Sequence, residues 1–415
     1  MSQQIHLLVL LHGLWGNTSH LVALERAIKD KNAEPNKDGE ILEVFLPKSN
    51  ESLATYDGID WGGERIADEL CERVEELAKE DKVVVKLSIT GYSLGGLIAR
   101  ILEHRKFFEK IEPVNFITIA APHMGLFQYS SMVSSLMGAL GPKLLSRTGK
   151  QFYCQDKWSS NDERPLLEVM ADPGKIFFKM LSRFKYLRLY ANATHDLLVP
   201  YCTSAIETED VFAEYLSNGI KIEMEEEYEC VIKKFTLPDT PPPKPAFLSR
   251  KWFENKKPRP LLPPAAQFRF PFNIIVYTLL PFLAIPAFSF LLYRLSVHSK
   301  GSEARIKLLE SDESYPKKLI SIFKELEQEI ESAAADMVNN PEGEPYPIAD
   351  PSLHPVITST QKKMARWLNQ LPFQKNLAFF PRVRNSHAVI VHKDGIPQHK
   401  QGESVVRHWA DHFVF

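Results

Sequence analysis

Gly91-Tyr92-Ser93-Leu94-Gly95-Gly96 is the segment from which the architecture of this chain follows. An apolar, β-branched run from Val83 to Thr90 precedes it, and a segment with helical spacing from Leu97 to Leu102 follows it. A strand, a glycine-flanked turn and a helix form the context in which G-x-S-x-G makes a nucleophile elbow. The glycines allow the strand and helix to approach closely around a strained serine. We therefore predict Ser93 as a nucleophile, against the alternative of a glycine-rich surface turn.

Segments on both sides of the elbow alternate between strand-like and helix-like patterns. The run from Ile5 to Leu11 is typical of a buried parallel strand, and residues 40–46 predict a second strand. Residues 61–80 carry their apolar side chains on one helical face. Val114 to Ala121 and Tyr186 to Ala191 are further strand-like runs. This order predicts a doubly wound, mostly parallel α/β sheet.

The first predicted strand runs into His12-Gly13-Leu14-Trp15-Gly16. In the α/β-hydrolase fold, the loop after this early strand supplies one backbone N–H of the oxyanion hole. We predict that the N–H of Leu14 is this donor, and that the N–H of Leu94, next to Ser93, is the second. The alternative for the first loop is an ordinary strand-to-helix turn.

A carboxylate and several histidines complete a candidate triad. Asp196 lies just beyond a predicted strand, where this fold holds the triad acid, and the chain order Ser, Asp, His requires an acid here. The alternative is a loop aspartate that caps the next turn. The base should follow the last strand, near residues 377–380, where His387, His392 and His399 are all in range. His123 precedes any candidate acid and is a weaker candidate.

Several of these segments together resemble the eukaryotic serine esterase and lipase family, and within it the lipid-droplet phospholipase of yeasts. The resemblance covers about residues 5–206 and 350–415. It implies an α/β-hydrolase fold, hydrolysis of carboxylic esters of lipids, and Ser93 and Asp196 as nucleophile and acid. The family's histidine, followed by a small residue and an apolar run, matches His387, with His392 as the second choice. The segments that carry the resemblance are His12 to Gly16, Gly91 to Gly96, Ala121 to Gly125, Arg147 to Gln151 and Asp196 to Pro200.

With 415 residues, the chain is longer than one compact core usually requires. We expect residues 1–206 to form the first part of the hydrolase core, with a lid-like segment at about 126–165. Residues 350–415 should return to the core with its last strand and helix. Residues 207–349 should form an insertion that contains a proline-rich linker at 238–264, an uncharged apolar run at 270–293 and a charged helix at 307–337.

The apolar run exceeds the length of about 18 residues that indicates a membrane segment. Pro281 and Pro286 disfavour one straight helix. Ser93 precedes the run and His387 follows it, so one membrane crossing would separate the two. We therefore predict a hairpin that enters and leaves one face of the membrane, or a segment lying in the headgroup layer. A buried core helix is the alternative.

Composition excludes several other classes of function. The net charge is −2, which gives no indication of a nucleic-acid partner. The four cysteines are far apart and form no C-x-x-C pair, so we expect reduced thiols, no disulfide framework and no zinc site. The run from Ile5 to Leu11 has no basic segment before it and no cleavage site after it, so a signal peptide is not expected. No metal or organic cofactor is implied.

The expected function is therefore hydrolysis of a phospholipid or glycerolipid ester at a lipid monolayer or membrane surface. We expect a monotopic, cytosol-facing protein on lipid droplets and the endoplasmic reticulum. A triacylglycerol or monoacylglycerol lipase and a protein thioesterase are the alternatives within the same chemistry. A membrane scaffold that has lost catalysis is the alternative of another class.

Overall fold

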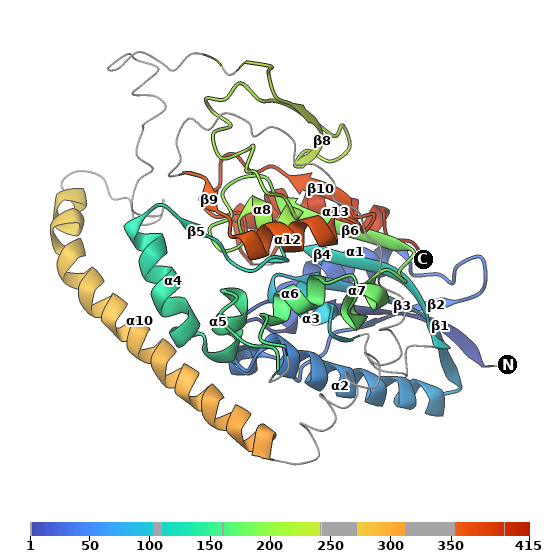
Figure 1. Cartoon of the computed structure of the whole chain (residues 1–415). Coiled ribbons are helices and arrows are strands. Elements are labelled where there is room, and N and C mark those ends of the chain that lie inside the picture. Colours follow the sequence, from blue (N-terminus) through green and yellow to red (C-terminus); the bar gives the residue numbers. More distant parts are fainter. Residues whose placement is uncertain are drawn as a thin grey trace.

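The computed structural model describes residues 2–102, 110–159, 162–240, 242, 272–311, 353–393 and 395–415. These residues form a central sheet with helices on both faces (Figure 1). The eight-stranded sheet has the order β2-β1-β3-β4-β6-β10-β8-β7. The first six strands in this order, from β2 to β10, pair in parallel. Strand β8 pairs antiparallel with both of its neighbours, β10 and β7. The prediction of a mostly parallel α/β sheet is confirmed.

The strands of the sheet, in chain order, are β1 Gln3–Leu11, β2 Ile41–Phe45, β3 Lys82–Tyr92, β4 Glu112–Ile119, β6 Tyr186–Asn192, β7 Lys221–Met224, β8 Val231–Thr236 and β10 Gln374–Ala378. Two short strands, β5 Gln128–Tyr129 and β9 Pro355–Val356, form a separate antiparallel pair. The helices are α1 Val22–Lys31, α2 Ile59–Lys79, α3 Leu94–Ala99, α4 Met132–Leu144, α5 Ser146–Phe152, α6 Leu166–Ala171, α7 Ile176–Leu181, α8 Tyr201–Ala205, α10 Phe272–Ser311, α12 Ser359–Leu368 and α13 Glu403–Asp411.

The two faces of the sheet bury alternate residues of its strands. In β1, Leu7 and Val9 belong to the core beneath α2, α3, α6 and α12, whereas Leu8 and Leu10 pack toward α1 and α13. Successive side chains of a strand point to opposite faces, so a strand covered on both sides is apolar throughout. This is why β1 reads as a continuous apolar run rather than as an alternating one.

The positions of strands β7 and β8 disagree with the predicted domain boundaries. The sequence analysis placed residues 207–349 outside the core. In the structure, Ile232 and Val231 of β8 pair with Leu377 and Ala378 of β10, so this part of the insertion extends the sheet. Of the predicted linker at 238–264, residues 241 and 243–264 lie outside the described residues, as do residues 312–337 of the predicted charged helix.

The apolar run forms part of α10, a continuous helix of 40 residues, so the predicted hairpin at 270–293 is wrong. Residues 272–293 and 307–311 lie on one helix that runs through Pro281 and Pro286. A proline removes one backbone hydrogen bond and favours a kink, but the bonds on either side can still continue the helix. Within the described ranges, no helix combines the length and the apolar character needed to cross a membrane.

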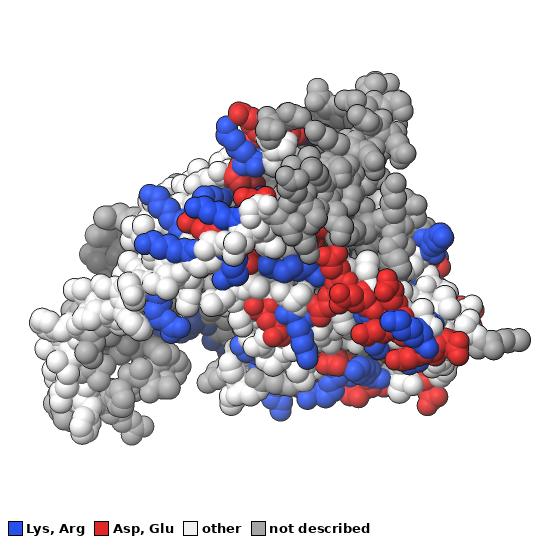
Figure 2. Space-filling model, turned by 90° about the horizontal axis from the view of Figure 1, so that it is seen from below, with Lys and Arg blue, Asp and Glu red and all other residues white. Residues whose placement is uncertain are grey.

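The first half of α10 projects from the molecule and exposes its apolar side chains. In Figure 2 the protruding left end, where α10 lies, is largely without charged side chains, and the blue and red residues gather elsewhere. Leu279, Ile285 and Leu291 are all exposed. They are six residues apart, and at 3.6 residues per turn they point in three evenly spaced directions around the helix axis. The exposed apolar surface therefore surrounds this half of the helix.

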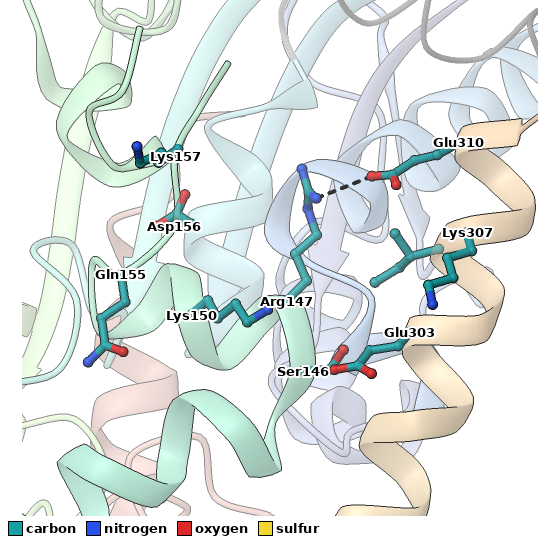
Figure 3. Close-up of a pocket in the computed structure, with 10 residues that line it drawn as sticks. Ser146, Arg147, Lys150, Gln155, Asp156, Lys157, Glu303, Lys307 and Glu310 are labelled. Atoms are coloured by element: carbon teal, nitrogen blue, oxygen red, sulfur yellow. Dashed lines mark hydrogen bonds and ion pairs between the residues drawn. The ribbon is translucent and has the colours of Figure 1, made fainter. Parts of the chain in front are cut away.

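The second half of α10 packs on the core beside α5. Ile306 is buried there, and the Ser299 hydroxyl donates to the carbonyl of Lys143 over 2.8 Å. A cleft of about 530 Å³ lies between α5 and α10, and Figure 3 shows Arg147 crossing it toward Glu310. Its lining mixes acidic and basic side chains and contains neither Ser93 nor Asp196.

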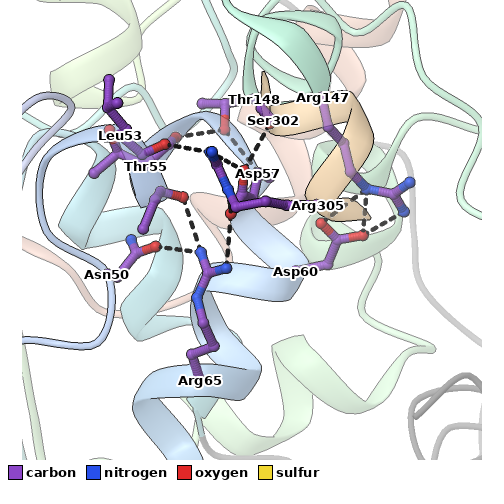
Figure 4. A network of polar contacts seen from close by, with 12 residues as sticks. Asn50, Leu53, Thr55, Asp57, Asp60, Arg65, Arg147, Thr148, Ser302 and Arg305 are labelled. Atoms are coloured by element: carbon purple, nitrogen blue, oxygen red, sulfur yellow. Dashed lines mark hydrogen bonds and ion pairs between the residues drawn. The ribbon is translucent and has the colours of Figure 1, made fainter. Parts of the chain in front are cut away.

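A buried carboxylate attaches α10 to the core (Figure 4). The side chain of Asp57 is fully buried and accepts hydrogen bonds from Arg65, from Arg305 and from the hydroxyl of Ser302, at 2.8, 2.8 and 2.6 Å. Arg65 belongs to α2, whereas Ser302 and Arg305 belong to α10. One carboxylate therefore joins residues of two helices, Arg65 and Ser302, that are more than 200 positions apart in the chain.

A second carboxylate, Asp60, holds α5 in place. Arg147 Nε and Gln151 Nε2 each donate a hydrogen bond to its carboxylate, both at 2.9 Å. Burial acts to raise the pKa of the Asp60 carboxyl, but the Arg147 guanidinium outweighs this effect and the pKa lies below its usual value. The segment from Arg147 to Gln151, which contributes to the family resemblance, thus has a structural role.

Asp57→Ala should lower the free energy of unfolding by about 2 kcal/mol, because Arg65 and Arg305 lose their shared buried partner while both remain partly exposed to water. Urea denaturation followed by tryptophan fluorescence measures this change. Lys29→Ala, which removes only an exposed pair with Glu25, is the control and should change stability by less than about 0.5 kcal/mol. Equal effects of the two substitutions would show that the Asp57 cluster does not stabilise the fold.

Candidate active site

Ser93 occupies a strained turn between β3 and α3. Its backbone has φ 56° and ψ −123°, a region that residues with a side chain rarely adopt. A Cβ atom on Gly91 would come within 2.5 Å of the Gly95 backbone, and one on Gly95 would collide with the carbonyl oxygen of Leu11. Glycine is therefore required on both sides of Ser93, as the sequence pattern predicts.

His387 lies within hydrogen-bonding distance of both Ser93 and Asp196. His387 Nε2 is 3.1 Å from Ser93 Oγ, and His387 Nδ1 is 2.9 Å from Asp196 Oδ2. Because an ionised carboxylate only accepts, Nδ1 carries the proton and the lone pair of Nε2 faces the serine hydroxyl. The structure thus brings together the three residues predicted as nucleophile, base and acid.

The carboxylate of Asp196 is fixed by hydrogen bonds to both of its oxygens. Oδ1 accepts from the backbone N–H groups of Leu198 and Val199 at 3.0 and 2.8 Å. Oδ2 accepts from Asn192 Nδ2 at 2.7 Å as well as from His387. These four donors together hold the carboxylate in one orientation, in which Oδ2 is directed at the imidazole.

The loops that carry Asp196 and His387 are tied to each other. Ser386 donates its N–H to the carbonyl of His195 and its hydroxyl to the carbonyl of Thr194, at 2.9 and 2.7 Å. Asn385 Oδ1 accepts a hydrogen bond from the N–H of His387. This contact forms an Asx turn, which orients the backbone that leads into His387. The sequence analysis missed Asn192, Asn385 and Ser386. Their positions close to Asp196 and His387 in the sequence could have indicated them.

Tyr92, to which the sequence analysis gave no role, contacts His387. Its hydroxyl donates to the backbone carbonyl of His387 over 3.1 Å, and the two rings lie 5.1 Å apart. Burial raises the pKa of the Tyr92 hydroxyl well above its usual value, with a further contribution from the Asp196 charge. Tyr92 therefore remains a neutral donor that positions the backbone of His387.

The two predicted oxyanion donors lie in segments that meet at Ser93. A Cβ atom on Gly13 would lie 2.8 Å from Ser93 Cβ and 3.2 Å from its Oγ, so the loop that contains Leu14 passes directly beside the nucleophile. Leu94 is the first residue of α3, and the N–H groups in a first helical turn have no acceptor within the helix. Both positions suit donors to a charge that forms at Ser93.

The other candidate histidines are placed differently. His123 is fully buried, its Nε2 lies 2.9 Å from the hydroxyl of Thr118, and burial lowers its pKa to about 3. His392 adopts a left-handed φ of 45°, and neither it nor His399 has a hydrogen bond to Ser93 among the described contacts. Only His387 is brought to the nucleophile.

A pocket of about 540 Å³ adjoins the acid side of the site. Asn192 and Asp196 form part of its wall, together with Met137 of α4 and Tyr153 just beyond α5. Exposed apolar side chains, including Leu197 and Met137, lie at its rim. The predicted lid-like segment thus contributes to this pocket, while its movement stays a prediction.

A serine in a strained turn at the carboxyl end of a central parallel strand, hydrogen-bonded to a histidine that in turn binds an aspartate, is the arrangement that defines serine esterases as a class. Residues 1–207 match the family described as "Putative serine esterase (DUF676)". The chain belongs to this family, and the resemblance inferred from the motifs is confirmed.

Relatives of the chain carry related names. "Putative lipase C4A8.10" of Schizosaccharomyces pombe is 28% identical over 250 residues, which are 55% of this chain and 31% of the relative. "Putative lipase ROG1" of Saccharomyces cerevisiae is 32% identical over 212 residues, covering 48% of this chain and 28% of the relative. The chain thus matches about a third of the length of these relatives.

Among solved structures, a lipase-esterase related protein from Clostridium acetobutylicum is 12% identical, with a TM-score of 0.21. The match covers 42% of this chain and 59% of that protein. A similarity this low supports no conclusion about function, so the functional assignment rests on the geometry of the site in this chain.

Tyr92→Phe should lower the free energy of unfolding by about 1–2 kcal/mol, because it leaves the buried carbonyl of His387 without its donor. Urea denaturation measures the change. Tyr186→Phe, at an exposed position, is the matched control and should have almost no effect. A stability loss no larger than that of the control would mean that the Tyr92 hydroxyl does not brace His387.

Proposed function

We propose that this protein is a serine hydrolase with an α/β-hydrolase fold that cleaves carboxylic ester bonds. The observation that carries the proposal is the chain of hydrogen bonds from Ser93 through His387 to Asp196, at 3.1 and 2.9 Å. The strand order supports the fold assignment, since the serine follows β3 in the middle of a parallel sheet and the acid and base follow β6 and β10.

In the proposed reaction, His387 Nε2 accepts the proton of Ser93 as the serine oxygen attacks the acyl carbonyl. Asp196 holds the imidazole in the required tautomer and stabilises the imidazolium that forms. The protonated His387 then donates its proton to the leaving alcohol, and an acyl-enzyme remains. Water attacks the acyl-enzyme by the same proton transfers, releases the acid and restores Ser93.

The backbone N–H groups of Leu14 and Leu94 are proposed to bind the oxyanion. One such donor is typically worth about 10²–10³ in turnover. The close approach of Gly13 to Ser93 supports this role, because any side chain at residue 13 would displace the loop that presents Leu14.

Ser93→Ala should abolish ester hydrolysis and labelling by a fluorophosphonate probe, and His387→Ala should lower turnover of p-nitrophenyl butyrate by about three orders of magnitude or more. His392→Ala is the matched control and should keep most of the activity. Circular dichroism checks that each variant is folded. Labelling of a folded Ser93→Ala protein, or a greater loss from His392→Ala than from His387→Ala, would refute the proposed roles.

The substrate is proposed to be a lipid ester, most specifically a phospholipid. The names of the relatives support a lipid, and exposed apolar residues near the site support contact with a lipid surface. Trp15 lies next to Leu14, and Leu197 and Leu198 follow Asp196, and all three are exposed. Apolar side chains gathered in this way beside a site are typical of a surface that binds another apolar phase.

We also propose that the first half of α10 binds the protein to a lipid monolayer, such as the surface of a lipid droplet or the cytosolic leaflet of the endoplasmic reticulum. A groove on a partner protein would cover one face of a helix, whereas this half of α10 exposes apolar side chains in all directions. Lipid acyl chains surround such a helix on every side. The second half remains fixed to the hydrolase through Asp57.

The double variant Phe282→Lys, Ile285→Lys should reduce flotation with phosphatidylcholine vesicles about tenfold or more, because two exposed apolar side chains become charged. Leu308→Lys is the matched control, since Leu308 is 72% exposed on the half of α10 that packs on the core, and it should float as the unmodified protein does. Hydrolysis of p-nitrophenyl butyrate should be unchanged in both. Flotation of the double variant at the unmodified level would exclude α10 as the lipid-binding element.

A further inference from the structure

The pocket beside Asp196 combines aromatic walls with negative charge. Tyr129, Tyr201, Phe212 and Tyr215 line it, and so does the carboxylate of Asp210. Among the described residues of its lining there is no lysine and no arginine. The faces of aromatic rings and carboxylates both attract cations, so the lining as a whole favours a positive ligand.

Asp210 forms no ion pair among the described contacts, and the nearby imidazole of His354 is paired with Glu214 at 3.2 Å. Asp210 Oδ1 accepts from the N–H of Phe212 at 3.1 Å. Burial raises the pKa of the carboxyl to about 6, although the backbone N–H groups of Phe212 and Ala213 and the attraction of His354 act to lower it. A carboxylate buried without a counter-ion is costly, and a cation that entered the pocket would compensate for it.

Two further buried atoms in the pocket have no hydrogen-bond partner. Asn192 is 1% exposed and Thr194 is 7% exposed, and neither Asn192 Oδ1 nor Thr194 Oγ1 has a partner among the described residues. Asn192 directs its amide nitrogen to Asp196, which leaves its oxygen free to accept. Unpaired buried acceptors are rare and call for a donor.

We propose that this pocket binds the primary ammonium of a lipid headgroup, of the ethanolamine type, while the ester lies at Ser93. Three N–H donors of an ammonium match the unpaired oxygens of Asn192 and Thr194 and the charge of Asp210. A quaternary ammonium has no N–H and gains only the cation–π attraction. The inference rests on the proposed function and names the class of its substrate.

The order of preference follows from the charges of the headgroups and from their N–H donors. Esters of a short-chain phosphatidylethanolamine should be cleaved with a higher kcat/KM than those of phosphatidylcholine, and these with a higher kcat/KM than those of phosphatidylglycerol, which carries no cation. Dihexanoyl lipids below their micelle concentration keep surface binding by α10 out of the measurement. The unmodified protein should prefer the ethanolamine lipid to the glycerol lipid by about tenfold or more.

Asp210→Asn should reduce this preference to about twofold, because the amide keeps the shape and the hydrogen bond to Phe212 but loses the charge. Thr194→Val removes the unpaired hydroxyl and should reduce the preference for the ethanolamine lipid over phosphatidylcholine. Asp239→Asn, at an exposed carboxylate outside the pocket, is the matched control and should leave both ratios unchanged. Turnover of p-nitrophenyl butyrate should be the same in all three variants.

Binding separates this inference from the proposed function. Glycerophosphoethanolamine should bind to the Ser93→Ala protein in calorimetry, and the added substitution Asp210→Asn should weaken that binding about tenfold. An absence of ester hydrolysis with intact binding would overturn the hydrolase proposal alone. Equal kcat/KM for the ethanolamine and glycerol lipids, or binding that is unaffected by Asp210→Asn, would overturn the ammonium pocket.

Discussion

The pairing of β10 with β6 is the constraint on which the site depends. Ala378 lies opposite Asn192 in parallel register, so the loops that leave the two strands emerge side by side. Ser386 then ties the loops together by two hydrogen bonds to backbone carbonyls. Because of this pairing, His387 reaches Ser93 although 294 positions separate them in the sequence. A shift of β10 by one residue would turn its side chains to the opposite faces of the sheet and withdraw the imidazole.

Local patterns in the sequence were sufficient for most of the core. The continuous apolar run of β1 and the glycines around Ser93 predict their structures, because the strand is covered on both faces and the turn tolerates no Cβ atom beside the serine. The parallel order of the sheet agrees with the prediction, and Ser93, Asp196 and His387 lie together while their catalytic roles stay a prediction. The choice among His387, His392 and His399 needed the family resemblance, since all three follow the last parallel strand.

The remaining features depend on contacts that no local pattern contains. Tyr92 and Asn192 became informative only when the structure placed them against His387 and Asp196. The hairpin was predicted from the prolines and from the positions of Ser93 and His387 on either side of the apolar run. Neither contains the anchor of α10, where Arg305 and Ser302 bind Asp57. Strands β7 and β8 were missed because a short exposed strand owes its conformation to its neighbour in the sheet rather than to its own sequence.

The long stretch of sequence between β6 and β10 also determines when the site can form during synthesis. The ribosome releases the segments with Ser93 and Asp196 first, and β10 must close a loop of more than 180 residues back to β6. The entropy of closing so long a loop grows only with the logarithm of its length, so the insertion adds little thermodynamic cost. The nascent chain nevertheless lacks its histidine until synthesis has passed His387, which follows Asp196 by 191 positions. Until then the chain of hydrogen bonds from Ser93 through His387 to Asp196 cannot form, so the site is completed only after β10 has joined the sheet.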